Sequence, residues 1–194
     1  MKSQFWDFFL HLIIKFLFIF AKKTMQPKFP SESVTTLTDL VLPGETNPLN
    51  NLFGGELLAR MDRAASIAAR RHSRRITVTA SVNHVAFNRA IPLGSVVTVE
   101  AKVSRTFNSS MEIYIDVWTE DRESGIRTKA NEAIYTFVAV DETGRPVPVP
   151  PIVPETDLEK ERFAAALRRK QLSLVLAGKM KPSEATELKA LFIE

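Results

Sequence analysis

The chain has 194 residues, 45% hydrophobic and 25% charged, which is typical of one globular domain with a substantial core. It contains no cysteine, which excludes disulfides, thiolate zinc sites and a cysteine nucleophile. Its three histidines, His11, His72 and His84, are scattered, so we expect no histidine-based metal site within one chain.

The net charge of +4 leaves two interpretations open. A mildly basic surface can attract polyanions such as nucleic acid or phosphorylated cofactors, or it can simply be solvated. No run of lysine and arginine carries interleaved aromatic residues that could stack bases. We therefore predict no nucleic-acid partner, and we note one basic cluster at a predicted helix end, Arg70, Arg71, Arg74 and Arg75.

Residues 5–20 are almost entirely apolar, yet the stretch is short for a membrane span, which needs about 20 residues. It also lacks the basic start and small-residue cleavage site of a signal peptide. Asp7, His11 and Lys15 recur every four residues, which is typical of a helix lying on a membrane surface. Alternatively, Met25 is the natural start and residues 1–24 are a start-site artefact.

Residues 33–42 predict a strand, and residues 43–53, rich in Gly, Pro and Asn, predict a loop. The Gly54-Gly55 pair then opens a long helix through His72. Its apolar residues recur at 3.6-residue spacing and include many alanines, so we expect this helix to be buried.

Period-two alternation then predicts four consecutive strands at 76–87, 95–107, 110–121 and 126–140. We expect an antiparallel meander following one buried helix, which is an α+β fold, with Met111, Trp118 and Phe137 in its core. Prolines at 141–154 end the sheet. Residues 155–177 predict an amphipathic helix, and residues 182–192 a second short one. The expected units are thus 25–154 and a helical extension, 155–194.

The sequence TNPLNNLFGGELLARMD at 46–62 resembles the acyl-CoA thioesterases of the cytosolic acyl-CoA hydrolase group. The likeness continues through 85–94, 105–111 and 135–150, in the same order, and covers about residues 33–170. It implies a single hotdog domain, in which an antiparallel sheet wraps round a central helix, acting on acyl-CoA in the cytoplasm in fatty acid metabolism. Asn50 departs from the glycine of many relatives, which bears on the backbone shape of the loop.

Asp62 shares a helix face with Gly55, Leu58, Ala65 and Ala69, so its carboxylate lies within an otherwise apolar stripe. A partly buried carboxylate suits a general base. From the residues alone, a surface aspartate paired with Arg63 or Ser66 is the competing interpretation. The resemblance places Asp62 on the catalytic acid of the family, acting as general base or nucleophile.

Gly54 and Gly55 begin the helix, where the first N–H groups lack partners and favour negative charge. We expect the Gly55 N–H, with Gly54, to polarise the thioester carbonyl, and we assign Phe53 and Gly54 to substrate binding. A plain glycine turn is the alternative. The resemblance implies that Asn47 of one subunit meets Asp62 of its partner; alone, Asn47 is equally a turn residue.

The resemblance places coenzyme A contacts at one strand turn, formed by Arg105, Asn108, Ser109 and Ser110. Arg89 and Lys129 are weaker candidates. We expect no cofactor beyond the coenzyme A of the substrate, and a homodimer or a dimer-based hexamer. Rival functions are a hotdog hydratase, against which the absence of histidine from 43–55 counts, and a non-catalytic acyl-CoA-binding protein.

Overall fold

The structure is a computed structural model, and it describes residues 25–121 and 124–192. The apolar segment 1–24, for which a surface helix and a start-site artefact were both considered, lies outside the described residues. Among the described helices, none is long and apolar enough to cross a membrane.

The central element is α2, Gly54–Ser73, which begins at the predicted glycine pair. Its inward face carries Met61 and a row of small side chains, Ala64, Ala65, Ala68 and Ala69, all fully buried. Small side chains let the helix axis approach the strands closely, so one helix can fill the inside of a curved sheet. The helix ends at Arg74, whose φ of 53° is left-handed.

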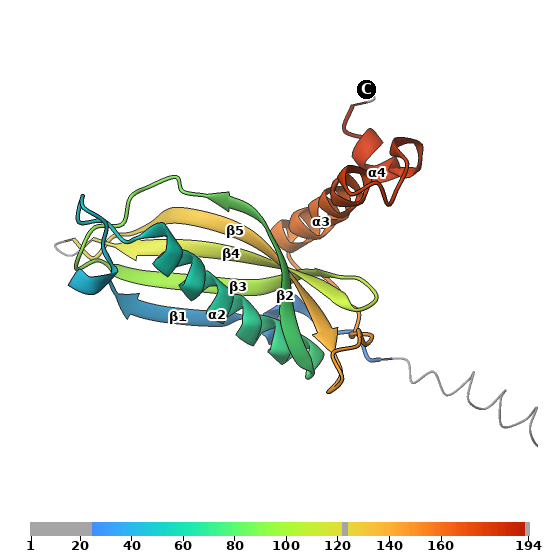
Figure 1. Ribbon diagram of the computed structural model, residues 1–194, viewed down its shortest axis with the longest axis horizontal. Helices are drawn as coiled ribbons and strands as arrows, with labels where there is room; N and C mark the ends of the chain where they lie inside the picture. Colours follow the sequence, from blue (N-terminus) through green and yellow to red (C-terminus); the bar gives the residue numbers. More distant parts are fainter. Residues whose placement is uncertain (1–24, 122–123, 193–194) are drawn as a thin grey trace, which may run out of the picture.

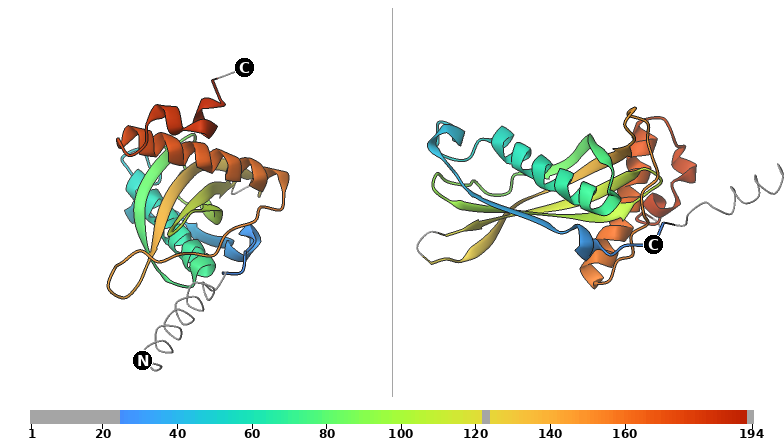
Figure 2. Two further views of the ribbon diagram at one scale, coloured as in Figure 1. Left: turned by 90° about the vertical axis from the view of Figure 1, so that its right-hand side faces the viewer. Right: turned by 90° about the horizontal axis from the view of Figure 1, so that it is seen from below.

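Five antiparallel strands form one sheet in the order β1-β3-β4-β5-β2 (Figure 1). Their bounds are β1 Thr35–Leu40, β2 Ile76–Ala86, β3 Val96–Thr106, β4 Ser110–Glu120 and β5 Arg127–Val140. The sheet curls round α2, as Figure 2 shows from the end and from below. This is the expected hotdog fold. Short 3₁₀ helices η1, Pro30–Ser33, and η2, Pro43–Glu45, flank β1.

The predicted four-strand meander is wrong at its first connection. Strands β3, β4 and β5 do follow one another as hairpins, but β2 pairs with β5 at the far edge, with Ile76 opposite Val140. The segment 87–95 between β2 and β3 is too long for a tight hairpin turn. It instead runs beside the loop before α2, where the Leu52 N–H donates to Ile91 O at 2.7 Å and the Leu93 N–H to Asn50 O at 2.9 Å.

The inner face of the sheet is apolar and packs on α2. Met111 and Phe137 are buried there, as predicted. Trp118 is not: it lies on the opposite face of β4, half-buried beneath the guanidinium of Arg127 at 4.8 Å. Side chains alternate along a strand, so an odd number of positions from Met111 puts Trp118 on the other face.

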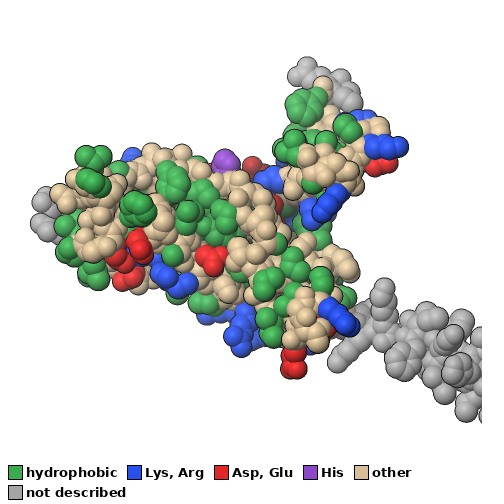
Figure 3. Space-filling model, in the orientation of Figure 1, with side chains coloured by type: hydrophobic (Ala, Val, Ile, Leu, Met, Phe, Trp, Pro, Cys, Tyr) green, Lys and Arg blue, Asp and Glu red, His purple; other side chains and the backbone are tan. Residues whose placement is uncertain are grey.

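Strand β2 is exposed along most of its length, although it carries Ile76, Val78 and Val82. One of its edges pairs with β5 and the other has no neighbouring strand among the described residues. Figure 3 shows hydrophobic side chains gathered toward the end of the molecule where α2 begins. An open, apolar edge strand offers unpaired backbone groups and apolar side chains to which another chain can bind.

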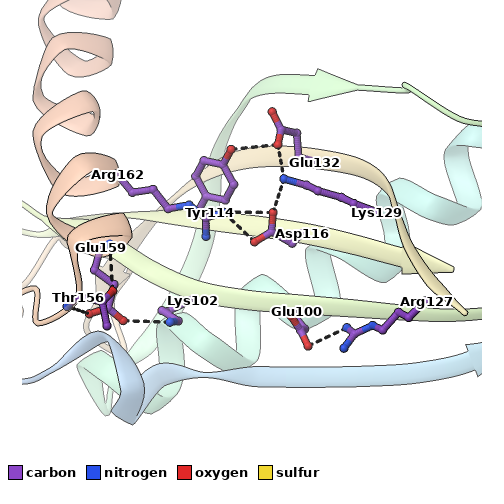
Figure 4. Close-up of polar contacts among 10 residues, drawn as sticks. All are labelled: Glu100, Lys102, Tyr114, Asp116, Arg127, Lys129, Glu132, Thr156, Glu159 and Arg162. Atoms are coloured by element: carbon purple, nitrogen blue, oxygen red, sulfur yellow. Dashed lines mark hydrogen bonds and ion pairs between the residues drawn. The ribbon is translucent and has the colours of Figure 1, made fainter. Parts of the chain in front are cut away.

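Helix α3, Asp157–Leu176, matches the predicted helix and crosses the outer face of the sheet (Figure 2). Charged pairs hold it there: Arg162 binds Asp116 at 2.9 Å, and Lys102 binds Glu159 at 3.0 Å (Figure 4). Beyond it lie η3, Pro182–Glu184, and α4, Thr186–Lys189, so only part of the second predicted helix forms. The expected apolar face of α3 is partly covered: Phe163, Leu167, Leu174 and Val175 are half-buried, whereas Leu176 is 79% exposed.

Candidate active site

Asp62 lies at the border of the buried face of α2, half-buried and turned toward β2. Its Oδ1 accepts a hydrogen bond of 2.8 Å from the Thr79 hydroxyl. The ladder between β2 and β5 is irregular between Thr79 and Ser81, so β2 bulges beside this contact. A bulge re-aims side chains locally, and here the threonine hydroxyl meets the helix carboxylate.

Tyr135 lies close enough to the Asp62 carboxylate to be influenced by its charge. It is buried on β5, and its hydroxyl donates to Leu58 O at 3.4 Å. Burial, together with the negative charge of Asp62, raises the pKa of Tyr135 to about 12. The phenol is therefore neutral at ordinary pH, and the carboxylate has an uncharged neighbour on its protein side.

The start of α2 presents backbone donors. The Leu57 N–H bonds to Phe53 O at 3.1 Å, while no bond is found for the N–H groups of Gly54, Gly55 and Glu56 within the described chain. A Cβ on Gly55 would meet the Phe53 ring at 3.3 Å, and one on Gly54 would meet the Phe87 ring at 3.6 Å. Two exposed aromatic rings thus border donors that glycine leaves accessible.

Asn47 organises the loop before α2. Its Oδ1 accepts from the backbone N–H groups of Leu49, at 2.9 Å, and Asn51, at 3.2 Å. These bonds close a tight turn in which Asn50 has a φ of 56°. Asparagine tolerates this left-handed conformation, which glycine adopts freely, so the departure at Asn50 is accommodated.

Within one protomer, Asn47 and Asp62 make no contact. Asp62 lies eight residues into α2, about 12 Å along the axis from its start, whereas Asn47 belongs to the loop before the helix. The backbone donors of Gly55 are separated from Asp62 by a similar length of helix. A single protomer therefore carries the expected groups without assembling them.

The turn between β3 and β4 lies away from the start of α2. Arg105, expected to contact coenzyme A, donates to Phe163 O at 2.8 Å, and its guanidinium stacks on the Phe163 ring at 4.0 Å. The β3 ladder shifts between Val103 and Arg105, which turns Arg105 onto the outer face beside α3. Burial lowers the pKa of its guanidinium.

The rest of this turn is more open. Asn108 is exposed, and Ser109 and Ser110 are half-buried. Lys170 of α3 extends over the Phe107 ring at 5.4 Å, which adds a cation that the sequence did not single out. Arg105 and Lys170 thus both lie over the Phe107 ring, next to the turn that carries the two serines.

Of the two weaker candidates, Lys129 is fully engaged. Its ammonium binds Asp116 at 2.7 Å and Glu132 at 2.6 Å (Figure 4). Burial acts against its charge, but these carboxylates raise the pKa of Lys129 overall. Arg89 lies on the exposed segment after β2, where its guanidinium is 3.5 Å from the Thr128 hydroxyl and its backbone forms long hydrogen bonds with the Asn131 side chain.

A groove of about 730 Å³ lies between α3 and the outer face of β2, β4 and β5. It has polar groups on the sheet side, including Tyr114 and Glu132, and apolar ones on α3, including Leu172. Asn83 lines it and donates to the Thr136 hydroxyl at 3.2 Å. The size is that of a cleft for a small molecule.

Comparison with known proteins places these residues in a family context. Residues 49–126 match the model of the thioesterase superfamily. An acyl-CoA thioester hydrolase of Bacillus subtilis is 42% identical over 147 residues, covering 76% of this chain and 86% of that protein. The human cytosolic acyl coenzyme A thioester hydrolase is 37% identical over 140 residues, 71% of this chain and 37% of that protein.

Solved structures give the same result. An apo-hexameric acyl-CoA thioesterase superposes with a TM-score of 0.76 at 38% identity, covering 79% of this chain and 98% of that one. The acyl-CoA hydrolase of Staphylococcus aureus, in complex with butyryl coenzyme A, coenzyme A and its disulfide, has a TM-score of 0.72 at 33% identity, covering 84% and 98%.

Three alanine variants of the Staphylococcus aureus enzyme are also similar, with TM-scores of 0.70 to 0.74. They replace one asparagine, one aspartate and one threonine. In that chain the asparagine lies 15 positions before the aspartate, and the threonine 17 positions after it. Asn47, Asp62 and Thr79 have the same two spacings. The sequence did not single out Thr79, because a threonine in an alternating strand gives no chemical signal.

Proposed function

This chain belongs to the thioesterase superfamily, among the acyl-CoA thioester hydrolases, and we propose that its reaction is centred on Asp62, held by Thr79. It is an enzyme that converts an acyl-CoA and water to a carboxylic acid and coenzyme A. Water adds to the carbonyl carbon, the C–S bond breaks, and the departing sulfur takes a proton. We propose no cofactor beyond the coenzyme A of the substrate, and water and the thioester supply every atom of the products.

The observation that carries the proposal is the half-buried Asp62 carboxylate, oriented by the 2.8 Å bond from Thr79. One carboxylate oxygen is thereby held, and the other is left to take a proton from water or to attack the carbonyl. As general base it yields free acid directly, whereas as nucleophile it passes through an acyl-aspartyl anhydride. A single turnover in ¹⁸O-labelled water tests the nucleophilic role, since hydrolysis of the anhydride at the aspartyl carbon places label in Asp62 and the general-base route never does.

Negative charge develops on the thioester oxygen as water adds. The N–H groups of Gly55 and Gly54 at the start of α2 are suited to receive it, because they are unpaired and lie at the positive end of the helix. The rings of Phe53 and Phe87 beside them supply an apolar lining for the acyl chain. Aromatic walls next to backbone donors favour a reacting carbonyl that carries an apolar chain.

We propose that the site is completed by a second copy of the chain, which brings Asn47 to Asp62. Three observations support this: Asn47 and Asp62 are apart within a protomer, the β2 edge beside Thr79 is open, and apolar side chains of β2 are exposed. Pairing two β2 strands about a two-fold axis would cover that edge and set each loop against the other helix. The hexameric relatives favour further assembly of such dimers.

We propose that the coenzyme A portion of the substrate binds in the groove beside α3 and at the turn between β3 and β4. Phosphates would be bound by two cations, Arg105 and Lys170, and by the hydroxyl groups of Ser109 and Ser110. All of these except Lys170 were expected from the sequence. Asn108 is exposed beside them. We also place the reaction in the cytoplasm and in fatty acid metabolism, in keeping with relatives named as cytosolic hydrolases.

The catalytic assignment is tested by thiol release from acyl-CoAs of graded length. Asp62→Asn should lower kcat/KM by at least about a hundredfold, because loss of a general acid-base group costs 10²–10⁴-fold. Asp157→Asn, which neutralises a fully exposed carboxylate on α3, is the matched control and should keep the wild-type rate. Equal rates for wild type and Asp62→Asn would refute the assignment.

The shared site is tested by mixing two strongly impaired variants, Asn47→Ala and Asp62→Asn, after unfolding and refolding them together. Each mixed dimer would hold one intact site, so a random mixture should recover about a quarter of the wild-type activity. If both residues acted within one protomer, no mixture would regain activity.

A further inference from the structure

The loop that carries Asn47 is fixed to α2 by one buried arginine. Arg60 lies in the second turn of α2, and its side chain is 5% exposed. Its Nη2 donates to both carboxylate oxygens of Glu45, at 2.9 and 2.8 Å, and to Leu40 O at 3.1 Å. It also lies 3.4 Å from Asp39. One helix residue thus binds both the end of β1 and the start of the loop.

Glu45 connects this arginine to both ends of the loop. Its Oε2 accepts from the Leu42 N–H at 2.8 Å, and its backbone carbonyl accepts from the Phe53 N–H, also at 2.8 Å. Phe53 directly precedes α2. The hydrogen bond from Leu42, and then the charge of Arg60, lower the pKa of Glu45, so its carboxylate is ionised at neutral pH.

Among the described residues, the Arg60 side chain forms hydrogen bonds through Nη2 alone. Its Nε and Nη1 are buried and find no partner within the described chain, so the guanidinium depends on the groups bound at Nη2. A buried charge relying on so few contacts is expensive for stability alone. Asn47 follows Glu45 by two residues, and the Asn47 side chain closes the turn in which Asn47 lies. The position of Glu45 therefore determines the position of Asn47.

We propose that Arg60 and Glu45 are positioning residues for Asn47. They set Asn47 relative to the Gly55 donor of the same chain and, across the proposed dimer interface, relative to the partner's active site. The inference rests on the proposed function, because it requires Asn47 to act in catalysis. Neither residue touches substrate. Their role is to hold the loop in the one geometry that places the Asn47 amide, and a misplacement of about 1 Å can cost a hundredfold in rate.

The test is a mutant cycle between Arg60→Met and Asn47→Ala, scored by kcat and KM. Alone, Arg60→Met should lower kcat at least tenfold and change KM by less than about threefold, since binding of the coenzyme A portion is untouched. In the Asn47→Ala background the same change should lower kcat by less than about twofold, because the residue through which it acts is gone. Arg70→Met, an exposed arginine on the same helix, is the control and should keep the wild-type rate.

Glu45→Gln provides a second route should Arg60→Met fail to fold, because glutamine keeps the shape and one acceptor while removing the charge. It should lower kcat in the wild-type background and leave it unchanged in the Asn47→Ala background. A folded Arg60→Met with wild-type kcat, or full additivity with Asn47→Ala for either variant, would overturn the proposal. If Asn47→Ala itself were fully active, the proposed function would fail first, and the cycle would show it.

Discussion

The contact between Thr79 and Asp62 permits a quantitative prediction. Thr79→Val removes the hydroxyl that donates to Asp62 at 2.8 Å and keeps a β-branched side chain of the same shape, suited to a strand. A hydrogen bond to a charged group contributes about 1.5–3 kcal/mol. If that bond orients the carboxylate in the transition state, kcat/KM should fall roughly 10- to 100-fold, at about 1.4 kcal/mol per tenfold.

Stability should fall by about 0.5–1.5 kcal/mol at most, the net contribution of a typical hydrogen bond, because Thr79 is exposed in the protomer. Thr79→Ser is the matched control: it keeps the hydroxyl and should stay within about threefold of wild-type activity. The assay is thiol release at limiting and saturating acyl-CoA, with thermal unfolding measured in parallel. A fully active Thr79→Val, or equal losses in both variants, would refute the role assigned to this hydrogen bond.

Three further predictions concern the fold. Asn50→Ala, at a φ of 56°, should lower the free energy of unfolding by about 1–2 kcal/mol in urea, whereas Asn50→Gly should stay close to wild type. Burial raises the pKa of Tyr114, and that of Tyr135 to about 12, so at pH 10 the folded protein should show less tyrosinate absorbance than the unfolded chain. Because the unfolded phenols ionise first, stability should fall as pH rises from about 10 toward 12, and a flat pH dependence would contradict this. Arg169→Ala removes the cation bound to the buried Glu112 at 2.8 Å, so limited trypsin digestion should cut α3 faster than in wild type.

Local sequence patterns were sufficient to predict the helices and strands and to single out one chemical group, the Asp62 carboxylate. The 3.6-residue spacing of alanines and Met61 predicted α2, and the same spacing put Asp62 within an apolar stripe, at whose border the structure places it. Alternation predicted four strands, and the β-rich composition of 33–42 predicted the other, all to within a few residues. These features depend on the period of a helix or a strand, which neighbouring residues set among themselves.

The order of the strands could not be derived that way. Alternation says which residues share a face, and carries no information about which strand lies beside which, so β2 was paired with β3 instead of β5. Trp118 was assigned to the core for a related reason, since an error of one position along β4 exchanges the inner and outer faces.

The sequence by itself determined that a carboxylate would lie on a buried helix opened by two glycines, because helical periodicity and the unpaired N–H groups of a helix start are local properties. Only the tertiary structure decided what surrounds that carboxylate. Strand pairing brought Thr79 to Asp62 across 17 positions, a shift in the β3 ladder turned Arg105 toward α3, and Arg60 fixed the loop of Asn47. Each of these contacts depends on long-range register and packing, where a displacement of one residue changes the neighbour.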